Sequence, residues 1–234
     1  MSFLTASGMT GGYGGVDIIH DCSLEVEKGQ IAVVVGPNGA GKSTAMKAVF
    51  GMLHLREGKV TLDGRDITGM APQDRVPCGM GFVPQSRNVF VSLTVEENLE
   101  MGAFIRTDDW KSQMEKMFEL FPRLKERRKQ PAGLMSGGER QMVAMGRAMM
   151  LEPKLILLDE PTAGLSPKFI DNTFEQVKLI NALGVGVLMV EQNAKQALAI
   201  ANRGYVFASG KNRFDDDARA MLANKEIAEM FLGG

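Results

Sequence analysis

The stretch that decides the fold is Ile31-Ala-Val-Val-Val35, followed directly by Gly36-Pro-Asn-Gly-Ala-Gly-Lys42-Ser43-Thr44. The first five residues are apolar and mostly β-branched, which is typical of a strand that is covered on both faces of a parallel sheet. The residues from Lys42 to Leu53 have a helix-like pattern. A sequence of the form GxxxxGK[ST] between a buried strand and a helix predicts a loop that binds phosphate groups.

The residue types of this loop suit phosphate chemistry. Glycines let backbone N–H groups curl around phosphate oxygens, and the N-terminus of the following helix adds partial positive charge. Lys42 is expected to reach the β- and γ-phosphates, and the Ser43 hydroxyl is expected to hold Mg²⁺. The alternative is a tight structural turn without a ligand. The predicted phosphate-binding residues are Gly36, Pro37, Asn38, Gly39, Ala40, Gly41, Lys42, Ser43 and Thr44.

A second apolar segment, Leu155-Ile-Leu-Leu158, ends in the carboxylates Asp159 and Glu160. Acids at the carboxyl end of a buried parallel strand lie where such sheets bind ligands. Because side chains alternate along a strand, the two acids point in different directions. Asp159 is expected to hold Mg²⁺ through water, and Glu160 to orient or deprotonate an attacking water, as phosphoryl transfer requires. The alternative is a strand that merely ends in solvated acids.

The composition excludes several classes of protein. The chain has 234 residues, of which 44% are hydrophobic, and 27 basic against 28 acidic residues give a net charge of -1. These values are ordinary for a soluble globular protein, and they exclude a disordered or fibrous chain and a global charge for binding nucleic acid. The apolar runs are far shorter than the ~18 residues of a membrane-spanning helix, and no signal-peptide pattern is present, so we expect any membrane role to be peripheral.

Short apolar runs recur along the chain and alternate with helix-like stretches, which is typical of a parallel α/β fold. Strands are predicted at residues 81–84, 155–158 and 185–190, and helices at 167–183 and 193–201. Between residues 85 and 151 the strand pattern disappears. The helices predicted there are 95–104, 111–121 and 139–150. We therefore expect an all-helical insertion in an α/β core.

The two ends of the chain have other patterns. Residues 1–30 and 58–68 are predicted to form short antiparallel strands, with turns at Glu57-Gly58 and Asp63-Gly64. Residues 218–232 have the pattern of an amphipathic helix that covers its own core or, alternatively, recruits a regulator. Because no linker interrupts the chain, we expect one domain over residues 1–234. Its core lobe is expected to comprise residues 1–85 and 151–234, and its helical lobe residues 86–150.

The segment Ser136-Gly137-Gly138-Glu139 precedes the last helix of the predicted insertion. Ser136 suits the N-cap position, and Glu139 three residues later suits a capping box. Capping does not explain the two glycines, which indicate a backbone pressed against an anion at a helix N-terminus.

Together, the phosphate loop, the Ser136 segment 23 residues before Asp159, and the acid pair resemble the ATP-binding cassette ATPases. The resemblance covers essentially the whole chain. It implies a P-loop NTPase core of the RecA type, with an antiparallel β subdomain and an inserted all-helical subdomain. It also implies ATP and Mg²⁺ as the bound groups, and ATP hydrolysis as the activity.

The same resemblance implies roles for further residues. Tyr13 matches the aromatic residue that stacks on adenine, although it also suits a plain strand aromatic. Gln85 matches a glutamine that touches Mg²⁺, so the implied metal-site residues are Ser43, Gln85 and Asp159. Gln192 stands where most members have a histidine near the γ-phosphate, and the implied catalytic residues are Glu160, Gln192 and Gln85. A neutral glutamine can still donate to a phosphate oxygen, unless it bonds to its own backbone.

Several segments resemble the smaller ATPase subunit of branched-chain amino-acid importers. They begin at Leu93, Phe121 and Val190, and the last is Phe231-Leu-Gly-Gly. The resemblance implies a dimer with a second ATPase subunit, in which the partner's Ser136, Gly137, Gly138 and Glu139 complete the ATP site.

The resemblance also implies two membrane permeases, a periplasmic or extracellular amino-acid-binding protein, and a peripheral position on the cytoplasmic face of the inner or plasma membrane. No nucleic-acid partner is expected. The alternatives are a urea or short-amide importer, a cassette acting on ribosomes or nucleic acid, and a small-molecule kinase.

Overall fold

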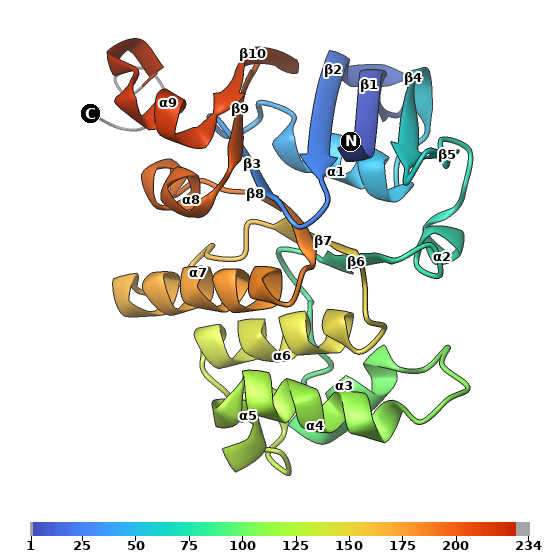
Figure 1. Ribbon diagram of the computed structural model, residues 1–234, viewed down its shortest axis with the longest axis vertical. Coiled ribbons are helices and arrows are strands. Elements are labelled where there is room, and N and C mark those ends of the chain that lie inside the picture. The colour runs from blue at the N-terminus through green and yellow to red at the C-terminus, as the bar shows by residue number, and fades with distance from the viewer. Residues whose placement is uncertain (1, 228–234) are drawn as a thin grey trace.

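The computed structural model describes residues 2–227, and its strands form two sheets (Figure 1). The first is antiparallel, with the order β2-β1-β4-β5. Its strands are β1 (Ser2–Tyr13), β2 (Val16–Glu27), β4 (Leu55–Leu62) and β5 (Arg65–Asp66). The second has the order β10-β9-β3-β8-β7-β6 and is parallel except for β10. Its strands are β3 (Ile31–Val35), β6 (Met80–Val83), β7 (Leu155–Asp159), β8 (Gly186–Val190), β9 (Arg203–Ala208) and β10 (Lys211–Asp217).

Helices cover both faces of the second sheet. Helix α1 (Lys42–Phe50) packs between the two sheets, whereas α3 to α6 gather on the opposite side, at the bottom of Figure 1. The other helices are α2 (Pro72–Arg75), α3 (Val95–Gly102), α4 (Trp110–Leu120), α5 (Pro122–Glu126), α6 (Gly137–Met149), α7 (Pro167–Ala182), α8 (Ala194–Ile200) and α9 (Ala218–Ala223), with a 3₁₀ turn at Ala132–Leu134. Within residues 2–227, no helix is both long and apolar enough to cross a bilayer.

The central strand β3 explains why its sequence is apolar without interruption. Ile31, Val33 and Val35 face the core shared with α3 to α7, whereas Ala32 and Val34 face the core shared with α1 and the first sheet. All five side chains are therefore buried, which explains why the strand has no polar residue. The predictions of a parallel α/β core and of helices within residues 86–150 are confirmed.

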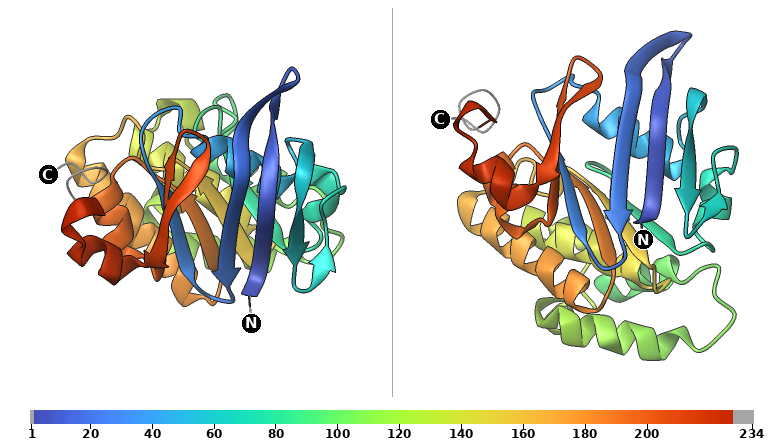
Figure 2. Two further views of the ribbon diagram at one scale, coloured as in Figure 1. Left: turned by 90° about the horizontal axis from the view of Figure 1, so that it is seen from above. Right: turned by 45° about the horizontal axis from the view of Figure 1, so that its top comes forward.

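The predicted turn at Glu57-Gly58 is wrong, because β4 continues through it. Gly58 has a φ of +100°, and a Cβ at this position would lie 2.6 Å from the carbonyl oxygen of Gly8. The register between β1 and β4 shifts here, so Gly58 lies opposite a bulge in β1 and does not mark a chain reversal. The first thirty residues likewise form two strands of twelve residues each, not short ones, and Figure 2 shows the long hairpin projecting from the body. The turn at Asp63-Gly64 is confirmed.

The predicted continuous C-terminal helix is also wrong. Helix α9 ends at Ala223, and Asn224 has an extended backbone. Residues 228–232 of that prediction lie outside the described residues. Strands β9 and β10 are not predicted by the apolar pattern, because only the middle of β9 is continuously buried and β10 alternates with exposed residues.

A buried arginine closes the C-terminus of α1. Arg75 is 1% exposed, and its guanidinium donates to the carbonyl oxygens of Val49 at 2.6 Å, Met70 at 2.9 Å and Thr68 at 2.9 Å. The cation thereby satisfies helix-end carbonyls and lies at the negative end of the helix dipole. Gly51 leaves room for it, since a Cβ there would lie 2.6 Å from Arg75 Nε.

We expect Arg75→Met to lower the free energy of unfolding by about 2–4 kcal/mol, because several buried carbonyls lose their donors. Urea unfolding followed by circular dichroism measures the change. The control is Arg56→Met, whose exposed guanidinium pairs with Asp17 and whose loss costs about 0–1 kcal/mol. Equal costs for the two variants would contradict a structural role for Arg75.

Candidate functional site

The loop between β3 and α1 has a backbone that requires glycine. Gly36 has a φ of +143°, and a Cβ there would lie 2.1 Å from the carbonyl oxygen of Phe207. Gly39 and Gly41 have φ values of +77° and +93°, a region that L side chains rarely adopt. Gly41 is also the N-cap of α1, so the loop leads directly into a helix N-terminus with free N–H groups.

Lys42 folds back into this loop. Its side chain is 4% exposed, and Nζ donates to the carbonyl oxygens of Gly36 at 2.9 Å and Pro37 at 3.1 Å. Burial lowers the pKa of Lys42, and the charges of Glu160, Asp159 and Glu191 partly offset this effect. The ammonium is thus held inside the loop, close to the acids that follow β7 and β8.

The first of these acids meets the loop directly. Ser43 Oγ donates to Asp159 Oδ1 at 2.7 Å, which joins the start of α1 to the end of β7. Hydroxyl and carboxylate oxygens are the donors that Mg²⁺ prefers, and Mg²⁺ at phosphate sites usually has only one or two carboxylate ligands. The residues present therefore fit Mg²⁺.

Glu160 lies at the meeting point of three strand ends. Its Oε2 accepts from Gln85 Nε2 at 2.8 Å and from Gln192 Nε2 at 3.0 Å. Gln85 follows β6, Glu160 follows β7 and Gln192 follows β8, so parallel neighbours deliver all three side chains to one edge. Glu160 has a φ of +47°, a strained conformation for a non-glycine residue that is often found at functional sites. Gln192 does not use its amide on its own backbone.

A second buried cluster lies behind this edge, and no role was predicted for its members. Glu191 is 1% exposed and accepts from the backbone N–H and hydroxyl of Thr162, both close to 3 Å. The Thr162 hydroxyl in turn accepts from Asn193 Nδ2 at 2.7 Å. One sequence signal marks Glu191, because it directly follows the buried strand β8 just as Asp159 ends β7.

Two predicted parts of the site lie apart from these groups. Tyr13 ends β1 at the hairpin tip, where the residue is 48% exposed; farther down the hairpin, Ile19 of β2 lies against Gly41. The Ser136 segment begins α6, which lies away from α1 in Figure 1. Its predicted capping box is confirmed: Glu139 N–H donates to Ser136 Oγ at 3.3 Å, and Ser136 N–H donates to Glu139 Oε2 at 2.9 Å.

The glycines of this segment have a packing role within the chain. A Cβ on Gly138 would lie 2.5 Å from a ring carbon of Phe169 in α7, and one on Gly137 would lie 3.0 Å from Leu165. Close packing of α6 on α7 is therefore one reason for a glycine at position 138, and the predicted anion contact stays a prediction. Gly137 is less constrained, because only a flexible side-chain end meets the added carbon.

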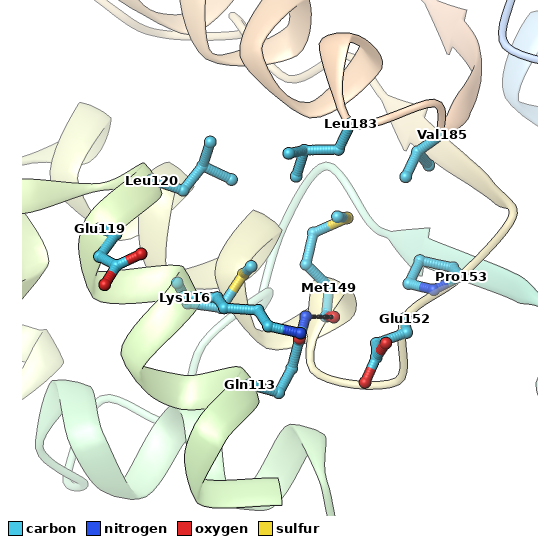
Figure 3. Close-up of a pocket in the computed structure, with 10 residues that line it drawn as sticks. Gln113, Lys116, Glu119, Leu120, Met149, Glu152, Pro153, Leu183 and Val185 are labelled. Carbon is cyan, nitrogen blue, oxygen red and sulfur yellow. Dashed lines mark hydrogen bonds between the residues drawn. The ribbon is translucent and has the colours of Figure 1, made fainter.

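A separate cavity of about 600 Å³ lies among α4, the end of α6 and the turn before β8 (Figure 3). Gln113 lines the cavity and donates to the carbonyl oxygen of Met149 at 3.0 Å. Leu120, Leu183 and Val185 make much of its lining apolar. None of the phosphate-loop residues or the acids at the strand ends lines this cavity, so it is distinct from the candidate site.

Comparison with known proteins agrees with this geometry. Residues 19–163 match the family described as "ABC transporter". The chain is 46% identical over 223 residues to the "High-affinity branched-chain amino acid transport ATP-binding protein BraG" of Pseudomonas aeruginosa, covering 95% of this chain and 96% of that protein. It is 39% identical over 227 residues to the "Probable branched-chain amino acid transport ATP-binding protein LivF" of Archaeoglobus fulgidus, covering 96% of each.

A solved structure leads to the same family. MJ1267, described as an ATP-binding cassette of an ABC transporter in its ADP conformation, superposes with a TM-score of 0.89 at 26% identity, and both chains are fully covered. The family match spans more than half of the chain, and both relatives are matched almost from end to end. The chain therefore belongs to the ABC transporter family, as one of its ATP-binding cassettes.

Proposed function

We propose that this cassette hydrolyses ATP to drive a membrane importer of branched-chain amino acids. The observation that carries the hydrolytic part is the convergence of Lys42, Ser43, Asp159 and Glu160 at one edge of the parallel sheet. The choice of transported solute rests on the similarity to BraG and LivF over nearly the full chain.

ATP binding is proposed for the loop and the hairpin beside it. The backbone N–H groups of residues 36–44, except Pro37, surround the phosphates, and Lys42 turns from the loop carbonyls to the β- and γ-phosphates. The exposed ring of Tyr13 stacks on the adenine. Ser43, Asp159 and the free amide oxygen of Gln85 are the proposed ligands of Mg²⁺, which neutralises phosphate charge when bound.

Hydrolysis is proposed to depend on Glu160 as the general base. Its carboxylate accepts a proton from the attacking water, while the amides of Gln85 and Gln192 fix its orientation. Gln192 also donates to a γ-phosphate oxygen when ATP is present. This arrangement supplies positioning and charge compensation, which are the main needs of phosphoryl transfer.

The proposed active unit is a dimer of two cassettes. The Ser136 segment packs against α7 of its own chain and lies away from its own phosphate loop. A second subunit facing the loop can bring its own Ser136 to Glu139 segment against the γ-phosphate. ATP binding then closes the dimer, and hydrolysis opens it.

The helical lobe is the proposed contact with two permeases. We assign it residues 86–150, with residues 1–85 and 151–234 as the core lobe. A cavity of about 400 Å³ lies between α3 and the start of α4, with Met101, Phe104 and Trp110 in its wall. Phe104 is 80% exposed, and Phe90 and Val91 are exposed nearby in sequence. Such apolar surface suits docking onto cytoplasmic permease loops, which would hold the cassette at the membrane.

The transported solute is tested by reconstituting the cassette with its permeases and its extracytoplasmic binding protein in liposomes. ATP-dependent uptake of radiolabelled leucine, competed by isoleucine and valine, is the expected result. Uptake of urea or a short amide without leucine uptake would replace the proposed solute and leave the ATPase assignment intact.

We expect Glu160→Gln to reduce ATP hydrolysis at least about 100-fold while ATP still binds, because the amide fills the same space but cannot accept the proton. Light scattering with Mg-ATP should show a stable dimer. Glu175→Gln, an exposed change on α7, is the control and should hydrolyse ATP normally. A fully active Glu160→Gln variant would rule out Glu160 as the base.

We expect Ser136→Ala to abolish hydrolysis by the dimer and to leave ATP binding by the isolated subunit intact. Thr94→Ala is a matched control, since Thr94 and Glu97 form an equivalent capping box on α3. Both variants should lose about 1 kcal/mol of stability, but only Ser136→Ala should lose turnover. Gly138 is left unchanged because of its contact with Phe169. Impaired ATP binding by isolated Ser136→Ala would place the segment in its own site.

We expect Gln192→Ala to lose much of the turnover, and Gln192→His to remain active. The histidine, with a reference pKa of about 6.5, stabilises the departing phosphate as a cation. Its rate should therefore fall as the pH rises between about 6 and 7, whereas the wild type shows no such limb. ATPase rates of the three proteins across pH measure this. Normal turnover by Gln192→Ala would show that Gln192 is a bystander.

A further inference from the structure

The buried carboxylate of Glu191 connects two segments that carry the proposed catalytic groups. Its Oε1 accepts from Thr162 N–H at 3.0 Å, and its Oε2 accepts from the N–H groups of Gln192 at 3.0 Å and Asn193 at 3.3 Å. The Thr162 hydroxyl lies 2.8 Å from both carboxylate oxygens. One side chain thus links the turn after β7 to the turn after β8.

The two linked segments carry the acceptor and the donor of the hydrogen bond between Glu160 and Gln192. Glu160 precedes Thr162 by two residues, and Gln192 directly follows Glu191. The bond from Gln192 Nε2 to Glu160 Oε2, at 3.0 Å, therefore spans the same gap that Glu191 closes from behind. A change in the distance between the segments would move the amide relative to the carboxylate.

Packing alone does not fix this gap. A cavity of about 230 Å³ lies between the segments, with Thr162, Leu165 and Ile170 on one side and Gln192 and Asn193 on the other. Side chains that border a cavity lack packing contacts on that side. The Glu160 N–H donates to the carbonyl oxygen of Val190 at 2.9 Å, which holds the two strand ends together. Beyond the strand ends, the hydrogen bonds of Glu191 join the two turns and so help to set how these turns lie relative to one another.

A carboxylate suits this position better than an amide. Every group that approaches Glu191 from Thr162, Gln192 and Asn193 is an N–H or a hydroxyl. A glutamine would turn two N–H donors toward some of these donors and leave buried groups unpaired. The Thr162 hydroxyl donates to Glu191 and accepts from Asn193, which extends the network by one residue.

We propose that Glu191 is a positioning residue for ATP hydrolysis, which holds Gln192 on Glu160 through Thr162 and the backbone of the β8 turn. This inference rests on the proposed ATPase function. It places Glu191 in contact with no reacting group, and its effect passes through Gln192. Thr162 has the same positioning role, because it is the partner of Glu191 in the turn after β7.

The kinetic test compares Glu191→Gln and Thr162→Val with the wild type. We expect kcat for ATP to fall about 10- to 100-fold, with KM changed less than about twofold, because misplacement affects the chemical step more than binding. Thr162→Ser, which keeps the hydroxyl, should restore kcat. The matched control is Thr173→Val, since Thr173 is equally buried, at 1%, but bonds only within α7 in the contacts described, to the carbonyl oxygen of Phe169.

A double-variant cycle shows whether the loss of kcat in Glu191→Gln comes from misplacement of Gln192 or from a general disturbance of the fold. If Glu191 acts through Gln192, the double variant Glu191→Gln/Gln192→Ala should be no slower than Gln192→Ala alone. Losses that multiply, or a loss in Thr173→Val as large as that in Thr162→Val, would overturn the proposal. Wild-type kcat in Glu191→Gln would also overturn it and leave the ATPase assignment in place.

A measurement without turnover keeps the two proposals distinguishable. The side-chain amide signals of Gln192 in ¹⁵N-labelled protein are identified by their disappearance in Gln192→Ala. In Glu191→Gln and Thr162→Val they should shift and exchange faster with solvent, whereas Thr173→Val should leave them unchanged. Unchanged Gln192 signals in both site variants would overturn the positioning role, even if the wild-type chain hydrolysed no ATP.

Discussion

Three buried carboxylates at one edge of a parallel sheet set the constraint on which the site depends. Asp159, Glu160 and Glu191 end or follow the neighbouring strands β7 and β8, and all three are largely shielded from water. Buried like charges are costly unless each is supplied with donors. The buried ammonium of Lys42 interacts electrostatically with all three acids and offsets part of their negative charge. The remaining donors are neutral and specific to each acid.

This distribution of donors divides the site into two halves with opposite electric charge: the acidic strand ends are negative, and the loop before α1 carries partial positive charge. Among the described residues, the acids at the ends of β7 and β8 outnumber the cation that they share, so this half is net negative and suits the proposed Mg²⁺. The loop before α1 presents backbone N–H groups and a helix N-terminus, so it attracts phosphate. Ser43 lies at the boundary, since it belongs to the helix start but donates to Asp159. A metal–phosphate pair matches such a boundary better than either ion alone.

The sequence predicted those features that are encoded within a few neighbouring residues. The phosphate loop, the acid pair and the capping box of Ser136 each depend on a local pattern with its own physical reason. The errors concern residues whose structure depends on distant contacts. Gly58 was predicted to form a turn, but it lies opposite a bulge of β1 at Gly8, and β4 continues through it. The contact of Gly138 with Phe169, 31 residues away in the sequence, was likewise not predicted, and the predicted anion contact of Gly138 stays a prediction.

Glu191 shows that an acid at the end of a buried strand can face either the phosphate loop or the region behind the sheet edge. It follows a buried strand just as Asp159 and Glu160 end one, yet its donors lie behind the sheet edge instead of at the loop. Its main partner, Thr162, is 29 residues earlier, so the pairing appears only after β7 and β8 align as neighbours. Pairing of β7 with β8 brings the three acids together, and the residues of the two turns then determine which donors each acid meets. The neutral amides of Gln85 and Gln192 hold Glu160 without adding a second cation, and the inward carboxylate of Glu191 joins the turn that carries Gln192 to the turn that carries Glu160.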